Sequence, residues 1–198
     1  MTATLAPAFM IQRYDLEGAA NVLENEGLLL LPTDALWSVA CLADDPVALE
    51  RLRRIRQRQT DQQPEVLFSS LTMLKSYAPQ LHPRLETLLA YHSRPLTVIT
   101  DADGRIRPKA RLADGRIAAR VVRDQYCRHL IKMLDRPLAT TVAHFTNSPY
   151  PDHFGRIRSD MIEAVDYVAK YRPRDPITGQ PTIMVQLDAE EELEFLRD

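Results

Sequence analysis

Short apolar runs alternate along this chain with segments in which apolar residues recur every three or four positions. The apolar runs predict strands at residues 28–31, 65–68, 96–100, 117–122, 137–143 and 182–187, and an extended segment at 166–169. Helical spacing predicts helices at residues 15–25, 70–77, 83–92, 124–134 and 161–164, and one that begins at residues 44–46. Because helices and strands alternate, the pattern predicts an α/β protein with a mixed sheet.

The chain has 198 residues, which is enough for one domain, and no linker divides it. Residues 171–181 are rich in proline and are expected to form a loop. We therefore expect a single domain over residues 1–198, with its core at about residues 12–188. A short N-terminal arm is expected before this core and an acidic C-terminal tail after it.

Composition and charge narrow the possible functions. Apolar residues make up 45% of the chain and charged residues 26%, and no apolar run approaches the ~20 residues of a membrane span. The N-terminus does not resemble a signal peptide. Cys41 and Cys127 lie in no CxxC or histidine pattern, so we expect no metal site and a cytoplasmic protein. The net charge of −2 means that any basic site must be local.

A local basic concentration follows the first buried strand. The strand ends in Pro32-Thr33-Asp34, and residues 51–58 then hold five arginines in eight positions. A strand tip that carries Thr and Asp, followed by a helix that carries arginines, indicates a site for phosphate or carboxylate. In the alternative interpretations, the arginines form a solvated or partner-binding helix face, and Thr33 only hydrogen-bonds its own turn.

Two further residues have both a functional and a structural interpretation. Arg120 lies in the apolar strand at 117–122, and a buried arginine is costly unless it is paired. It therefore either anchors a ligand carboxylate or phosphate, or pairs with a structural Asp or Glu. Trp37 either walls a ligand pocket or belongs to the core.

Six segments in order resemble the YrdC/YciO family. They are Pro32-Thr33-Asp34, Arg54-Ile-Arg-Gln-Arg58, Pro95-Leu-Thr97, Arg120-Val121, Thr141-Val-Ala-His144 and Pro181-Thr182, and the resemblance extends from about residue 15 to residue 187. It implies a single-domain, twisted mixed sheet with helices around a deep basic groove. Catalytic members are L-threonylcarbamoyladenylate synthases, nucleotidyltransferases that convert threonine, bicarbonate and ATP into threonylcarbamoyl-AMP and pyrophosphate. The product serves tRNA threonylcarbamoyladenosine modification, and members have also been described as binding double-stranded RNA.

Carried over residue by residue, the resemblance implies catalytic roles for Arg56, Arg58 and Thr33. It implies contacts to nucleotide or substrate for Thr33, Trp37, Arg56, Arg58, Thr97, Arg120, Thr141, His144 and Thr182. ATP is expected as a substrate with Mg²⁺ as its helper, and no redox cofactor is expected. The other expected ligands are L-threonine and bicarbonate, and the expected macromolecular partner is tRNA or double-stranded RNA.

Several positions depart from the family pattern. Arg56 replaces a lysine, and Val142 and His144 replace a serine and an asparagine. The chain also differs at Ala35, Ser38, Arg94 and Gln186. Loss of the serine's hydrogen bond to a charged group costs about 1.5–3 kcal/mol. The sequence therefore leaves two functions open, a divergent synthase and a non-catalytic paralogue of the YciO kind that binds ATP, AMP or double-stranded RNA.

Overall fold

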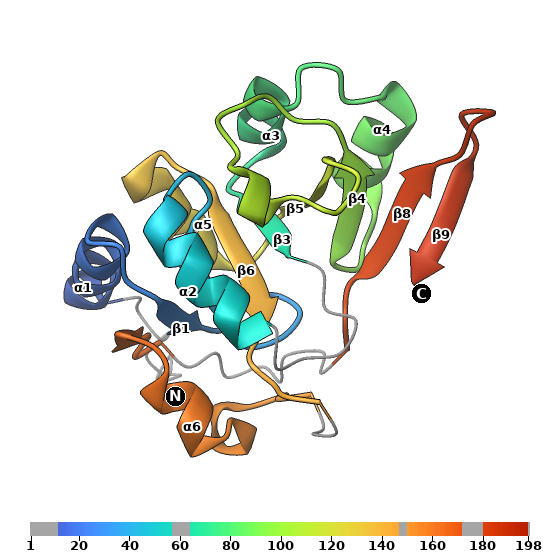
Figure 1. The fold of residues 1–198 in the computed structure, drawn as a ribbon. Coiled ribbons are helices and arrows are strands. Elements are labelled where there is room, and N and C mark those ends of the chain that lie inside the picture. Colours follow the sequence, from blue (N-terminus) through green and yellow to red (C-terminus); the bar gives the residue numbers. More distant parts are fainter. Residues whose placement is uncertain (1–11, 57–63, 147–149, 172–179, 198) are drawn as a thin grey trace, which may run out of the picture.

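A nine-stranded sheet lies at the centre of the residues that this computed structural model describes, which are 12–56, 64–146, 150–171 and 180–197 (Figure 1). Its strands are β1 (Leu29–Leu31), β2 (Ser38–Leu42), β3 (Glu65–Phe68), β4 (Leu96–Thr100), β5 (Ile117–Val121), β6 (Leu138–Val142), β7 (Tyr167–Val168), β8 (Ile183–Leu187) and β9 (Leu193–Arg197). Their order across the sheet is β7-β1-β2-β6-β3-β5-β4-β8-β9. The pairs β1–β7, β3–β5 and β4–β8 are parallel and the others antiparallel, which confirms the predicted mixed sheet.

The helices of the described residues flank this sheet. They are α1 (Arg13–Glu24), α2 (Pro46–Arg56), α3 (Leu71–Tyr77), α4 (Pro83–Tyr91), α5 (Gln125–Leu134) and α6 (Ser159–Glu163), with 3-10 turns at Pro108–Ala110 and Phe154–Arg156. Asp45 accepts hydrogen bonds from the backbone N–H groups of Val47 and Ala48, and Asp124 accepts one from Cys127. These carboxylates satisfy the free donors of a helix start, as the sequence predicts for both positions.

The central sheet is buried on both faces, which explains why its strands read as continuous apolar runs. Leu30 packs into a core shared with α2, α3 and α4, whereas Leu29 and Leu31 pack into a second core with α1 and α5. All three leucines are fully buried. None of the helices within the described ranges is long and apolar enough to cross a membrane.

Two strands were missed by the sequence prediction. Residues 38–42 form β2, whose small residues are buried on both faces and therefore show no alternation of apolar and polar positions. Residues 193–197 form β9, so residues 182–187 are not the last strand, and part of the predicted acidic tail pairs with β8. Asp188 holds the connecting turn by accepting hydrogen bonds from the N–H groups of Glu190 and Glu192. Figure 1 shows this β8–β9 hairpin at one edge of the sheet.

Candidate functional site

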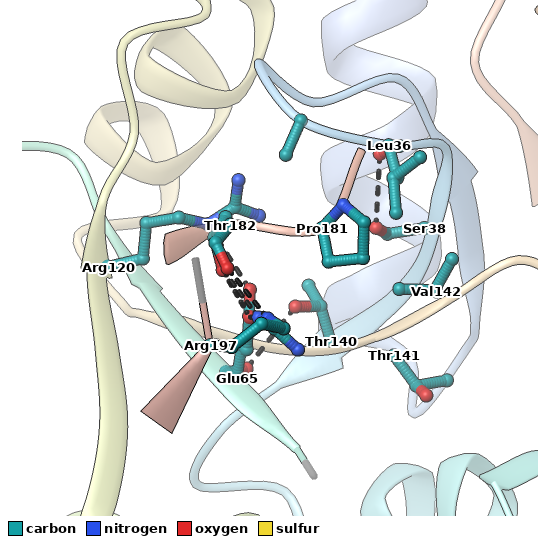
Figure 2. A pocket seen from close by; sticks show the side chains of 11 residues that line it. Leu36, Ser38, Glu65, Arg120, Thr140, Thr141, Val142, Pro181, Thr182 and Arg197 are labelled. Atoms are coloured by element: carbon teal, nitrogen blue, oxygen red, sulfur yellow. Dashed lines mark hydrogen bonds and ion pairs between the residues drawn. The ribbon is translucent and has the colours of Figure 1, made fainter. Parts of the chain in front are cut away.

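A narrow cavity lies where the ends of several strands meet (Figure 2). Its polar lining includes Ser38 from β2, Glu65 from β3, Arg120 from β5, Thr141 from β6, Arg197 from β9, and Thr182 directly before β8. The volume open to a water-sized molecule is about 20 Å³. That is space for about one water molecule, because a water needs roughly 10–15 Å³ on this measure.

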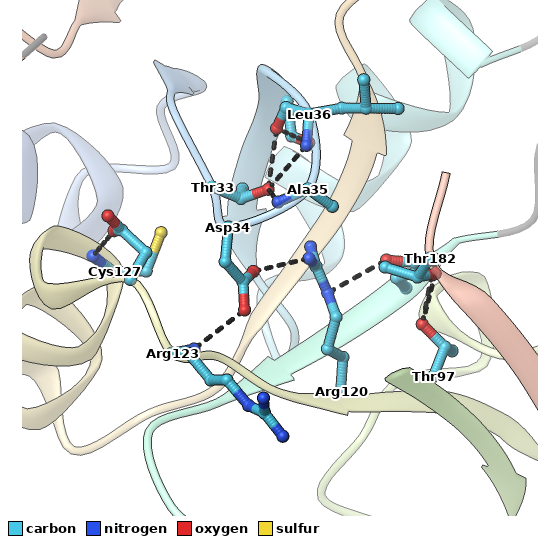
Figure 3. Close-up of polar contacts among 12 residues, drawn as sticks. Thr33, Asp34, Ala35, Leu36, Thr97, Arg120, Arg123, Cys127 and Thr182 are labelled. Carbon is cyan, nitrogen blue, oxygen red and sulfur yellow. Dashed lines mark hydrogen bonds and ion pairs between the residues drawn. The ribbon is translucent and has the colours of Figure 1, made fainter. Parts of the chain in front are cut away.

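The loop after β1 carries the first charged group of the site (Figure 3). Thr33 folds this loop: its Oγ1 accepts hydrogen bonds from the N–H groups of Ala35 and Leu36, both at 3.1 Å, and donates to the carbonyl of Leu36 at 2.7 Å. The turn interpretation of Thr33 is therefore what the structure shows. The result is that Asp34 points toward Arg120.

Arg120 is a buried cation held between two carboxylates. Its side chain is 2% exposed, with Nη1 2.8 Å from Asp34 Oδ1 and Nε 3.3 Å from Glu65 Oε2. Burial by itself lowers the pKa of Arg120, but the charges of Asp34 and Glu65 outweigh it and hold the pKa above its usual value. The guanidinium therefore keeps its charge inside the sheet, and Asp34 and Glu65 are the structural partners of the second interpretation.

Glu65 connects Arg120 to the hairpin (Figure 2). Its Oε1 accepts hydrogen bonds from Thr97 Oγ1 at 3.2 Å, Thr182 Oγ1 at 3.0 Å and Arg197 Nη2 at 3.3 Å. The two threonine hydroxyls lie 2.7 Å apart, and Arg197 Nη2 also donates to Thr182 Oγ1 at 2.7 Å. Thr97, Thr182, Glu65 and Arg197 thus form one polar network.

The charges of the described lining are balanced. Arg120 and Arg197 contribute two positive charges, and Glu65 together with the adjacent Asp34 contributes two negative ones. Guanidiniums and hydroxyls are good partners for phosphate and carboxylate oxygens. In the described structure, however, Arg120, Arg197 and Thr182 are engaged by the protein's own carboxylates.

The predicted site residues fall into three groups. Arg120, Thr141 and Thr182 line the cavity, Thr97 belongs to its polar network, and Thr33 hydrogen-bonds the lining residues Ala35 and Leu36.

The second group lies outside the described lining. Trp37 is 1% exposed and packs in the core against Phe154, with ring centroids 5.4 Å apart. His144 packs on Tyr150, and burial lowers its pKa. Arg56, the last residue of α2, has its pKa lowered by burial and by the charge of Arg53.

Arg58 forms the third group, because it falls outside the described residues.

Two charged lining residues are absent from the sequence prediction. Glu65 is a charged residue at the start of an apolar strand, a signal of the same kind as Arg120, and it was read only as part of that strand. Arg197 stands among acidic and exposed residues, and only its pairing with β8 brings it to the cavity. No local pattern of the sequence marks Arg197.

Comparison with known proteins places this fold in a family. The family model Sua5_yciO_yrdC, described as telomere recombination, matches residues 21–198. The chain therefore belongs to the Sua5/YciO/YrdC family, which confirms the predicted resemblance.

Two curated relatives are threonylcarbamoyl-AMP synthases. The threonylcarbamoyl-AMP synthase of Chromohalobacter salexigens is 28% identical over 148 residues, which cover 74% of this chain and 80% of the relative. The threonylcarbamoyl-AMP synthase of Escherichia coli K12 is 26% identical over 184 residues, which cover 86% and 95%.

Solved structures share the fold. E. coli YciO superposes with a TM-score of 0.76 at 20% identity, covering 94% of this chain and 90% of YciO. P. abyssi Sua5 in complex with L-threonine gives a TM-score of 0.78 at 18% identity, covering 94% of this chain and 54% of Sua5. The chain thus spans little more than half of Sua5.

Proposed function

We propose that the cavity is part of the substrate site of a divergent threonylcarbamoyl-AMP synthase, which uses L-threonine, bicarbonate and ATP and serves tRNA modification. The observation that carries the proposal is the convergence of Arg120, Thr141 and Thr182 from separate strand ends in one cavity. A guanidinium flanked by hydroxyls is suited to hold a carboxylate or phosphate oxygen. The names of the curated relatives and the L-threonine in Sua5 supply the substrates.

In this reaction, the main task of the protein is to hold the carbamate and the triphosphate close together. The threonine nitrogen attacks the carbon of bicarbonate, and water leaves to give a carbamate. A carbamate oxygen then attacks the α-phosphorus of ATP, and the bond to the bridging oxygen of the β-phosphate breaks as pyrophosphate departs. Cationic side chains offset the charge on the leaving group, and Arg56 and Arg58 are proposed for this role.

Mg²⁺ is proposed to enter with the triphosphate. Within the described part of the chain, no group of three or more His, Cys, Asp or Glu is placed to hold a metal ion. The two carboxylates at the cavity, Asp34 and Glu65, already pair with arginines. These side chains do not fit a resident metal site, and no step of the reaction is assigned to one.

A non-catalytic paralogue of the YciO kind, which binds ATP, AMP or double-stranded RNA, is the second candidate. Val142 favours it because this residue lines the cavity with methyl groups at the position where the resemblance implies a serine. The paired guanidiniums favour it as well, since a ligand must compete with Asp34 and Glu65.

Pyrophosphate release separates the two candidates. The synthase proposal predicts release that requires ATP, L-threonine and bicarbonate together. Thr182→Val is expected to lower the rate about tenfold, because it removes a hydroxyl worth about 1.5 kcal/mol. Thr87→Val, at an exposed position of α4, is the matched control and should leave the rate unchanged. Absence of threonine-dependent release, with ATP binding retained in calorimetry, would reject the synthase in favour of the second candidate.

A further inference from the structure

The carboxylate of Glu65 occupies the position in the cavity where donors converge. Glu65 is the first residue of β3, which lies in the middle of the sheet between β5 and β6. Its Oε1 takes hydrogen bonds from Thr97, Thr182 and Arg197, and its Oε2 faces Arg120. Two hydroxyls and two guanidiniums thus surround the two oxygens of this carboxylate. The same arrangement would bind the oxyanion of a ligand.

The Glu65 carboxylate does not satisfy all the hydrogen-bond donors of Arg120. Its Nε is buried and makes no hydrogen bond, although Glu65 Oε2 lies 3.3 Å away and forms an ion pair with it. A buried donor without a hydrogen bond is costly and calls for an explanation. Another oxygen, positioned in line with this N–H, would satisfy it.

The space in the cavity forces a choice between Glu65 and a ligand. About 20 Å³ is open, which admits a water molecule but not a phosphate or carboxylate group beside Glu65. A ligand oxyanion that contacts Thr182, Arg197 and Arg120 together would take the position of the Glu65 carboxylate, because these three side chains converge on it. The side chain of Glu65 is 17% exposed, so its carboxylate is in contact with solvent as well as with the cavity.

We propose that Glu65 is a tethered competitor that occupies the oxyanion position of the cavity and must leave before a ligand phosphate or carboxylate binds. The inference deepens the proposed function, on which it rests, because it concerns the same cavity. An anion attached to the protein competes at an effective concentration in the millimolar range. Glu65 also reduces the charge of the lining from +1 to zero, so it weakens the attraction for anions.

The test is calorimetric titration of the full chain with inorganic pyrophosphate and, separately, with L-threonine. Glu65→Gln keeps the shape and an acceptor oxygen but removes the charge, and it is expected to bind pyrophosphate at least tenfold more tightly than the wild type. A gain with pyrophosphate alone assigns the position to a phosphate, and a gain with threonine alone assigns it to a carboxylate. Glu50→Gln is the matched control, because Glu50 pairs with Arg53 and Lys109 away from the cavity. It should change neither affinity.

Equal or weaker binding of both probes by Glu65→Gln would overturn the inference. A melting curve shows whether this variant is folded; if it is not, Glu65→Asp replaces it, since it keeps the charge but withdraws the carboxylate by one methylene. A smaller gain in affinity is expected for Glu65→Asp, and no gain would again overturn the inference. Threonine-dependent pyrophosphate release is measured in parallel. If this release is absent but Glu65→Gln binds a probe more tightly, the synthase proposal is rejected and the role of Glu65 is retained.

Discussion

Arg120 keeps its charge in the middle of the sheet because Asp34 and Glu65 face it from two neighbouring elements. The sequence alone indicates that an arginine among alanines and valines needs a partner, since an unpaired buried charge is prohibitive. It does not identify that partner, because Asp34 is 86 residues away along the chain.

Removal of the Arg120 charge should strongly destabilise the folded protein. Arg120→Met replaces the guanidinium by an apolar side chain and leaves Asp34 and Glu65 without their shared partner. We expect the free energy of unfolding to fall by about 3–5 kcal/mol, as for other broken buried pairs. Urea denaturation measures it, with Arg54→Met as the control because the Arg54 side chain is 73% exposed. A loss no larger than that of the control would contradict the ion-pair account.

At the scale of elements, one carboxylate fastens α1 to the segment around β7. Asp15 is buried and accepts hydrogen bonds from the backbone N–H groups of Lys170 and Tyr171 and from the Tyr167 hydroxyl at 2.8 Å. These donors lie more than 150 residues along the chain from Asp15. A helix near the start of the chain thereby positions the edge strand that pairs with β1.

Asp15→Asn is predicted to destabilise the protein by about 1–3 kcal/mol, because the amide turns an acceptor into a donor that faces N–H groups. The change is read from the urea midpoint at constant m-value. Glu17→Gln on the same helix is the matched control, since Glu17 forms only an exposed pair with Arg13. Its expected effect is about 0.5 kcal/mol or less. Equal effects of the two substitutions would show that Asp15 does not fasten β7.

On the scale of the whole molecule, several arginines of the described residues pair with nearby acids. Arg51 pairs with Asp166, Arg53 with Glu50, Arg116 with Asp114 and Arg136 with Asp44. Nucleic-acid binding by unspecific electrostatics needs cations that are available to phosphates. Together with the net charge of −2, this pairing weakens the general attraction of the protein for a polyanion.

Binding of double-stranded RNA is therefore expected to be weak and salt-dependent. Fluorescence anisotropy with a labelled duplex of ~16 base pairs, the length that double-stranded RNA domains span, measures it. The affinity should fall by more than tenfold between ~50 mM and ~200 mM salt, because phosphate contacts release counterions. Tight binding that is insensitive to salt would contradict this expectation and would indicate a shaped RNA site.

The sequence by itself determined the class of fold and most of its elements. Buried strands such as β1 are continuous apolar runs, and the helix starts at Asp45 and Asp124 carry capping side chains, so local chemistry is sufficient to predict them. The order of the motifs also gave the family, and three residues of the cavity lining, Arg120, Thr141 and Thr182, were named in advance.

Only the tertiary structure decided what fills the cavity. Glu65 and Arg197 meet there because β3 lies next to β5 and β9 folds back on β8, and such pairings join residues 132 positions apart. Trp37 lies in the core, which is also a result of tertiary packing, because burial depends on which elements pack around a side chain. Local patterns specify elements, whereas the partner of a charge depends on contacts between residues that are distant in the chain.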